Sequence, residues 1–161
     1  MMSQQFVEAF DKINTNFAKV FRDLFGGGTA KLVLTTDDPL TAGVDIYAEP
    51  PGKSANVKLM SLSGGEQTLT AIAILFAILK IRPMPFCLLD EIDAALDDAN
   101  AERFAKYLHR FAGDTQFIVI THRKPTMEAT DALYGVTMEN KGVTKIVSVK
   151  LSDAIANITQ N

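Results

Sequence analysis

Two continuous apolar runs constrain the fold of this chain most strongly. One is Phe86-Cys-Leu-Leu89, followed by Asp90 and Glu91, and the other is Phe117-Ile-Val-Ile-Thr121, followed by His122. Strands that are apolar throughout are typical of a parallel sheet covered by helices on both faces. Open α/β sheets bind their ligands at the carboxyl ends of the strands, so the polar residues that follow these runs are candidate site residues.

Helical patterns alternate with these two strands. We expect helices at about 63–81 and 99–111, a short helical segment at 126–131, and two more strands near 133–138 and 143–151. This alternation predicts an α/β fold with a largely parallel sheet flanked by helices.

The amino-terminal part shows a different period. Its apolar residues recur at alternating spacings of four and three: Phe6, Phe10, Ile13, Phe17, Val20 and Leu24. The spacing is that of a coiled-coil seam, but one amphipathic helix packed on its own domain would show nearly the same stripe, and the two interpretations carry equal weight. The helix should end at Gly26-Gly-Gly28.

Residues 29–62 read as a small antiparallel patch. Strands are expected at 31–35 and 44–48, with a further strand around Val57 to Met60. Gly52-Lys-Ser54 matches the tail of a phosphate-binding loop, but two prolines precede it and no helical pattern follows, so we predict a turn with an exposed Lys53.

Composition limits the possible classes of protein. The chain has 161 residues, 47% of them hydrophobic and 22% charged, which is ordinary for one globular domain. The net charge, 16 − 19 = −3, neither suggests nor excludes nucleic acid. A single Cys87 in an apolar run fits a reducing compartment and a buried small hydrophobe. The longest apolar stretch, Ala71–Leu79, is shorter than the about 20 residues that span a bilayer, and no signal pattern opens the chain, so we expect a cytoplasmic protein.

Two helix starts carry polar residues. Ser63-Gly-Gly-Glu66 fits a capping box, and Asp97 or Asp98 fits a plain N-cap before the next helix. The capping box does not explain two consecutive glycines, each of which costs about 1 kcal/mol relative to alanine in a helix. Bare N–H groups at a helix start attract anions, so a phosphate-binding interpretation has about the same weight as the structural one.

The strand ends carry the groups that hydrolysis requires. One carboxylate of Asp90 and Glu91 can help to hold Mg²⁺, and the other can orient or deprotonate a water molecule. The alternative is that both acids serve as turn residues or caps. His109 should lie on the exposed side of a charged helix. His122 ends the second strand, so a site role for this histidine carries about the same weight as a structural or solvated one.

Together these segments resemble the carboxy-terminal head segment of the SMC (structural maintenance of chromosomes) family, and most closely its bacterial chromosome-partition members. Leu62-Ser-Gly-Gly-Glu-Gln67 is similar to the ABC signature motif, Phe86–Glu91 to a Walker B motif, Ala95-Leu-Asp97 to the D-loop and His122 to the switch histidine. The similarity extends to further segments: Phe25-Gly-Gly-Gly28, Pro50-Pro-Gly-Lys53, Asp93–Asn100, Thr121-His-Arg-Lys124 and Leu133–Met138.

The resemblance implies an ATPase head assembled from the two ends of one long polypeptide. The amino-terminal segment of such a head supplies the Walker A loop and the Q-loop, which we expect this chain to lack, so the chain alone should be inactive. Residues 1–25 would then be the base of the carboxy-terminal coiled-coil helix and residues 26–161 the carboxy-terminal lobe of the head. Because the seam starts abruptly in mid-heptad, Met1 is expected to mark an artificial boundary.

The resemblance also assigns roles to residues. Asp90 is expected to hold Mg²⁺ through water, Glu91 to activate the hydrolytic water, and His122 to contact the γ-phosphate of ATP in the same head. Asp97 is expected to organise the interface between two heads. The residues expected to bind the ATP of the opposing head are Ser63, Gly64, Gly65 and Glu66.

The partners follow from the same resemblance. They are the amino-terminal half of the head, a second head in an ATP-dependent homodimer, DNA through the full complex, and the carboxy-terminal winged-helix domain of a kleisin subunit, ScpA in bacteria. We expect the kleisin on the final strands and a helix near 152–158, a location at the nucleoid, and no contact with a membrane. The alternatives are the head half of an SMC-like DNA-repair ATPase and a kleisin-docking module without hydrolysis.

Overall fold

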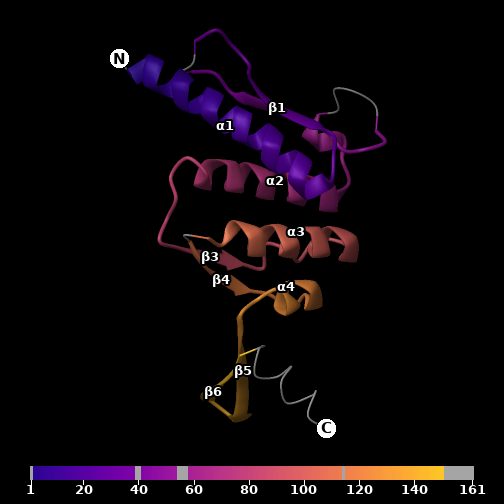
Figure 1. Ribbon diagram of the computed structural model, residues 1–161, viewed down its shortest axis with the longest axis vertical. Coiled ribbons are helices and arrows are strands. Elements are labelled where there is room, and N and C mark those ends of the chain that lie inside the picture. Colours follow the sequence, from indigo (N-terminus) through magenta and orange to yellow (C-terminus); the bar gives the residue numbers. More distant parts are fainter. Residues whose placement is uncertain (1, 39–40, 54–57, 114, 151–161) are drawn as a thin grey trace.

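The computed structural model describes residues 2–38, 41–53, 58–113 and 115–150. The helices are α1 (Met2–Phe25), α2 (Gly64–Leu79), α3 (Asp98–Phe111), α4 (Lys124–Glu128) and the short 3-10 helix η1 (Leu59–Ser61). The strands are β1 (Thr29–Leu34), β2 (Val44–Glu49), β3 (Phe86–Asp90), β4 (Gln116–Ile120), β5 (Ala132–Asn140) and β6 (Val143–Lys150). In Figure 1 the helices α1, α2 and α3 lie one beneath the other, with β1 beside α1 and β3–β4 beyond α3.

One hydrophobic core joins these layers. Phe17 and Phe21 of α1, Phe76 of α2 and Phe104 of α3 are fully buried. The ring centroid of Phe76 lies 6.4 Å from that of Phe104 and 5.9 Å from that of Phe117 in β4. The core therefore connects the first helix of the chain to the sheet that carries the candidate site.

The apolar stretch in α2 is a core helix, as its length predicts. Leu69, Ile72, Ala73 and Phe76 are buried along one face of this helix. Within the described part of the chain, no helix is long and apolar enough to cross a membrane.

The seam of α1 is divided between two environments. Phe17, Val20 and Leu24 in its second half are fully buried against the rest of the domain. Phe6 and Val7 near its start are exposed, and Phe6 stacks only on Phe10 with ring centroids 6.2 Å apart. Packing on its own domain is thus confirmed for the second half of the helix, whereas the coiled-coil interpretation of the exposed first half stays a prediction.

The helix α1 ends at the three glycines, as predicted. Gly26 and Gly28 have positive φ angles of 72° and 81°, a region that suits glycine. A Cβ atom on Gly28 would lie 2.2 Å from the carbonyl oxygen of Glu49, so only glycine fits there. The chain can therefore turn sharply from α1 into β1.

The strands β1 and β2 form the expected antiparallel pair, in register from Thr29 opposite Glu49 to Leu34 opposite Val44. The outer edge of β1 is covered by a side chain of α1. The Asn14 amide accepts a hydrogen bond from the backbone N–H of Leu32 at 2.8 Å and donates one to the Leu32 carbonyl at 3.1 Å. This side chain replaces a neighbouring strand at that position.

The expected largely parallel sheet is not confirmed, because the described residues form three separate two-stranded sheets. Only β3 and β4 are parallel, in register from Phe86 opposite Gln116 to Asp90 opposite Ile120. One face of this pair packs against the helical core and includes Cys87, where burial raises the pKa of the thiol. The other face is uncovered, so these two strands lack the second layer that parallel strands normally have.

Two local predictions are wrong. The strand expected around Val57 to Met60 is reduced to a single bridge between Lys58 and Tyr47, followed by η1, because the chain turns at once toward the start of α2. Val57 itself lies outside the described residues. The helix expected at 126–131 is α4, which begins at Lys124 because Pro125 suits the first turn, where a helix needs no N–H donor.

The strands β5 and β6 form an antiparallel hairpin that projects away from the rest of the domain in Figure 1. Most of its described apolar side chains are exposed: Tyr134, Val136, Met138, Val143, Ile146 and Val147. The hairpin therefore carries an apolar surface that the described residues leave uncovered.

Candidate functional site

The ends of β3 and β4 bring together three of the predicted site residues. Asp90 is the last residue of β3, and His122 follows β4 by two positions. The backbone N–H of Glu91 donates a 2.9 Å hydrogen bond to the carbonyl of Ile120, which continues the parallel pairing by one residue. Because the strands are parallel, Asp90, Glu91 and His122 lie at the same edge of the sheet, and all three are exposed.

Glu91 has an unusual backbone. Its φ angle is +48°, and among the described non-glycine residues it alone has a positive value. The left-handed region costs a non-glycine residue about 1–2 kcal/mol, and such strain is concentrated at functional sites. The side chains of Asp90, Glu91 and His122 form no hydrogen bond or ion pair with a described residue. Three polar groups therefore face solvent beside the strained backbone of Glu91, and none of them is used in a contact with the described residues.

The start of α2 is the predicted capping box. The Ser63 hydroxyl accepts a hydrogen bond from the Glu66 N–H, and the Glu66 carboxylate accepts from the Ser63 N–H at 2.9 Å. Lys53, exposed in the turn that was predicted for it, donates to the same carboxylate at 2.7 Å. Partial burial favours the protonated acid, but the hydrogen bonds from Lys53 and Ser63 hold the pKa of Glu66 below its ordinary value. The polar side chains of this helix start therefore have local partners.

The two glycines of this helix start are not required by packing. A Cβ atom on Gly64 would meet nothing within 4 Å, and one on Gly65 would lie 3.4 Å from the carbonyl oxygen of Ala95, an ordinary contact distance. Neither has a positive φ angle. The glycines leave backbone N–H groups bare toward the outside, while Gly65 places the start of α2 against the segment that precedes α3.

Asp97 is the N-cap of α3, as the structural interpretation predicted. Its side chain accepts a 2.8 Å hydrogen bond from the backbone N–H of Asn100, and its second oxygen accepts one from the Asn100 side chain at 3.1 Å. A role at an interface between heads would be additional to this capping role.

One residue of this region had no predicted role. Asp93 is completely buried, and one oxygen of its carboxylate accepts hydrogen bonds from the hydroxyls of Thr121 and Thr126. Its loop is thereby tied to the segment that carries His122. No sequence signal marks Asp93, because it stands among other acids and its partners lie 28 and 33 positions further along the chain.

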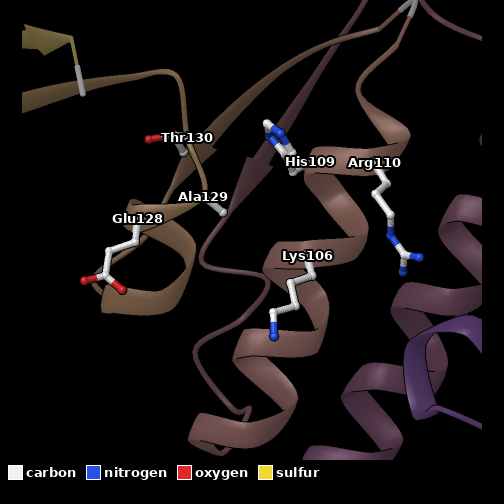
Figure 2. A pocket seen from close by; sticks show the side chains of 6 residues that line it. All are labelled: Lys106, His109, Arg110, Glu128, Ala129 and Thr130. Carbon is white, nitrogen blue, oxygen red and sulfur yellow. The ribbon is translucent and has the colours of Figure 1, made fainter. Parts of the chain in front are cut away.

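A hollow of about 640 Å³ lies elsewhere on the surface. Figure 2 shows the residues that line it, from α3 and from the end of α4: Lys106, His109, Arg110, Glu128, Ala129 and Thr130. None of the predicted site residues lines this hollow. His109 is exposed on α3, as expected, and stays separate from the strand ends.

The donor set suits a magnesium ion that is held partly by other molecules. Among the described residues, no group of three or more histidine, cysteine or acidic side chains could hold a metal ion. Mg²⁺ is commonly bound through one or two carboxylates together with waters and substrate phosphates. The exposed carboxylate of Asp90 fits such a site as a single donor.

Comparison with known proteins places the chain among SMC heads. The family model described as RecF/RecN/SMC N terminal domain matches residues 9–145. The chromosome partition protein Smc of Clostridium kluyveri is 61% identical over 151 residues, and that of Bacillus subtilis is 59% identical over 153 residues. These alignments cover 93% and 94% of this chain but 13% of either relative, so the chain spans a small part of their length.

Solved structures agree with this placement. One, from work on the ATP-driven dimerisation and DNA-stimulated activation of SMC ATPases, has a TM-score of 0.85 and 40% identity, and the match covers 98% of this chain and 96% of that one. Another is the Smc head domain of Pyrococcus furiosus with an extended coiled coil, bound to the carboxy-terminal domain of ScpA. It has a TM-score of 0.81 and 43% identity, over 94% of this chain and 38% of that one.

Proposed function

Because the chain belongs to the RecF/RecN/SMC family, we propose that it is the carboxy-terminal half of the ABC-type ATPase head of an SMC protein that condenses and segregates chromosomes. Two ATP molecules would be held between two such heads, and hydrolysis would release the heads from each other. One observation carries the proposal: β3 and β4 bring Asp90, Glu91 and His122 to one edge, yet the sheet that these strands form is covered on one face only.

The uncovered face of β3–β4 supports the idea of a missing half. Phe86 and Leu88 of β3 are 60% and 58% exposed, and Ile118 and Ile120 of β4 are 48% and 49% exposed. Apolar side chains gathered on one face of a parallel pair are typical of strands that a further layer buries. The amino-terminal half of the head, with its Walker A and Q-loop segments and further parallel strands, is the layer we propose.

The strand-end residues would perform the hydrolysis. The Glu91 carboxylate is exposed and unpaired among the described residues, so it is free to accept a proton from an attacking water. His122, on the same edge, would donate a hydrogen bond to the γ-phosphate and so position it. Asp90 would hold Mg²⁺ through a water molecule, and the ion would supply charge compensation for the phosphates.

The start of α2 would serve the ATP of the opposing head. The bare backbone at Gly64 and Gly65 suits a phosphate at a helix start. Glu66 would act there through the cap that it forms with Ser63. The adjacent Asp97 segment would lie at the same interface. A Ser63→Arg variant should therefore block dimerisation of heads and leave binding of ATP to one head intact, whereas unchanged dimerisation would remove Ser63 from the interface.

We also propose that the β5–β6 hairpin contributes to docking of a kleisin. Its exposed apolar side chains offer a surface of the kind that a partner covers. A relative of this chain has been solved with the winged-helix domain of ScpA bound to its head. The helix expected near 152–158 lies outside the described residues, so the hairpin alone supports this part of the proposal. DNA would be bound by the complete complex, at the nucleoid in the cytoplasm.

Reconstitution tests the proposal directly. The chain alone should turn over no ATP, and addition of the amino-terminal half should restore turnover. Leu88→Asp places a charge on the uncovered face and should prevent association of the two halves. Met60→Asp is the matched control, because Met60 is 85% exposed on η1, away from that face. Robust turnover by the chain alone, or normal association of the Leu88→Asp variant, would refute the split head.

A further inference from the structure

Asp93 is a buried acid between two functional segments, and its surroundings do not neutralise it with a cation. Its side chain is 0% exposed. One carboxylate oxygen accepts from Thr121 Oγ1 at 2.8 Å and from the hydroxyl of Thr126, while the other has no partner among the described residues. A buried polar atom without a partner costs about 1–3 kcal/mol. The two threonine hydrogen bonds offset part of this cost, because without the acid the buried hydroxyl of Thr126 would lose its acceptor.

The hydroxyl of Thr121 links this acid to the backbone on both sides of His122. It donates to Asp93 and accepts a 2.9 Å hydrogen bond from the backbone N–H of Arg123. The guanidinium of Arg123 in turn donates to the Asp98 carboxylate at 2.8 Å. Thr121, immediately before His122, is therefore fixed to the loop that follows β3, and Arg123, immediately after it, to the first residue of α3.

That loop begins at Glu91. The carbonyl of Glu91 accepts from the N–H of Ala94 at 3.1 Å, and the carbonyl of Asp93 accepts from the N–H of Leu96 at 3.1 Å. Asp93 is thus held by its main chain in the turn of Glu91 and by its side chain to the turn of His122. It is the single described residue with both attachments.

We propose that Asp93 is a positioning residue for hydrolysis, which sets His122 in place relative to Glu91 through the hydroxyl of Thr121. The inference rests on the proposed ATPase function, because the relative position of Glu91 and His122 matters only if both act in hydrolysis. The clamp formed by Asp93, Thr121 and Thr126 adds no chemical group to the reaction. It fixes the backbone from which the reacting side chains extend.

The two threonines provide a matched pair of variants. Thr121→Val and Thr126→Val each remove one hydroxyl donor from the same carboxylate at nearly constant volume, so both should lower the melting temperature. Thr121→Val also removes the acceptor of the Arg123 N–H, so kcat is compared after both variants are shown to be folded at the assay temperature. Only Thr121 adjoins His122. In the reconstituted head we expect Thr121→Val to lower kcat by about 10- to 100-fold with the KM for ATP nearly unchanged, since a displacement of about 1 Å can cost that much. Thr126→Val should lower kcat far less, and Thr121→Ser, which keeps the hydroxyl, should restore it.

A double-mutant cycle with His122→Ala decides whether Thr121 acts through the histidine. Residues that act as a unit are non-additive, so Thr121→Val should have little further effect on kcat once His122 is gone. In the nucleotide-free head, hydrogen exchange of the backbone N–H of Arg123, which donates to Thr121, should accelerate in Asp93→Ala and Thr121→Val and remain slow in Thr121→Ser.

The outcomes separate this inference from the proposed function. If the reconstituted wild-type head turned over no ATP, the proposed function would fail and the positioning role with it. If the wild type were active but Thr121→Val and Thr126→Val lowered kcat equally, or Thr121→Val acted additively with His122→Ala, the positioning role alone would be overturned. Unchanged exchange of the Arg123 N–H in Asp93→Ala would overturn it as well.

Discussion

The start of α2 and the ends of β3 and β4 differ in how their polar side chains are bonded. At the helix start, Ser63 and Glu66 satisfy each other, and Lys53 completes the set. At the strand ends, Glu91 and His122 are exposed and have no hydrogen-bond partner among the described residues. The first arrangement is explained by the stability of a helix, whereas no contact among the described residues explains the second. Substitutions at the helix start should therefore lower the stability of this chain, whereas substitutions at the strand ends should change activity with little effect on stability.

The largest effect that tests this contrast is expected for Glu91→Gln. Loss of the base should lower ATP turnover of the reconstituted head by about 100-fold or more. The free energy of unfolding should change by less than about 0.5 kcal/mol, because the exposed carboxylate has no partner to lose. Turnover assays and urea unfolding check the two parts, and the solution mass with ATP should show an accumulated dimer of heads. A monomer at saturating ATP would count against the role given to Glu91.

The second largest effect is expected on stability, from substitution of the N-cap residue at the start of α2. Ser63→Ala removes the N-cap of α2 and should lower the free energy of unfolding by about 1 kcal/mol. Urea unfolding of the chain measures this change. Ser63→Thr keeps an oxygen at the cap and serves as the control, with most of the stability retained. If Ser63→Ala were as stable as the wild type, the capping box would not explain the polar side chains at the start of α2.

A smaller effect of opposite sign is expected from relief of strain at the strand end. Glu91→Gly fits the positive φ angle and should raise the free energy of unfolding by up to about 1 kcal/mol. Glu91→Ala retains the strained backbone and should leave stability close to that of the wild type. Both variants should be inactive in the reconstituted head. Equal stability of the glycine and alanine variants would show that the turn stores no strain.

The smallest effect is a dependence on pH. The pKa of Glu66 is lowered in the folded chain, so its contribution to stability is present above the ordinary value of 4.5 and is lost as the pH falls below it. Glu66→Gln should remove this contribution, worth less than about 1 kcal/mol because Lys53 is partly exposed. The free energy of unfolding of the wild type should therefore exceed that of Glu66→Gln at neutral pH, and the two values should converge as the pH falls below 4.5. Parallel curves would contradict the ion pair with Lys53.

The sequence was informative where a pattern is local. The apolar runs before Asp90 and His122 predicted two strands with polar ends, and the spacing of Ser63 and Glu66 predicted the capping box, because neighbours along the chain determine both. The chemical roles of these residues remain predictions. The division of the α1 stripe into buried and exposed halves could not be predicted, since burial depends on elements far away in the sequence.

The same reason explains what was missed. The sequence shows Asp93 as one acid among several, and only the fold brings the hydroxyls of Thr121 and Thr126 to it. The separation into three small sheets was also invisible, because an apolar strand pattern does not say which strand lies beside which. Non-local pairing, and not local propensity, limited the prediction.

The amide of Asn14 has a consequence for how the domain can grow. The amide forms hydrogen bonds with both backbone groups of Leu32 that point away from β2. At the middle of this edge of β1, therefore, neither a donor nor an acceptor is free for a further strand. A peptide could pair with β1 at this position only after it had displaced the side chain of Asn14, which is held on a rigid helix. Unpaired edge strands promote aggregation by pairing with other molecules. In this domain a side chain of the first helix blocks such pairing at the middle of β1.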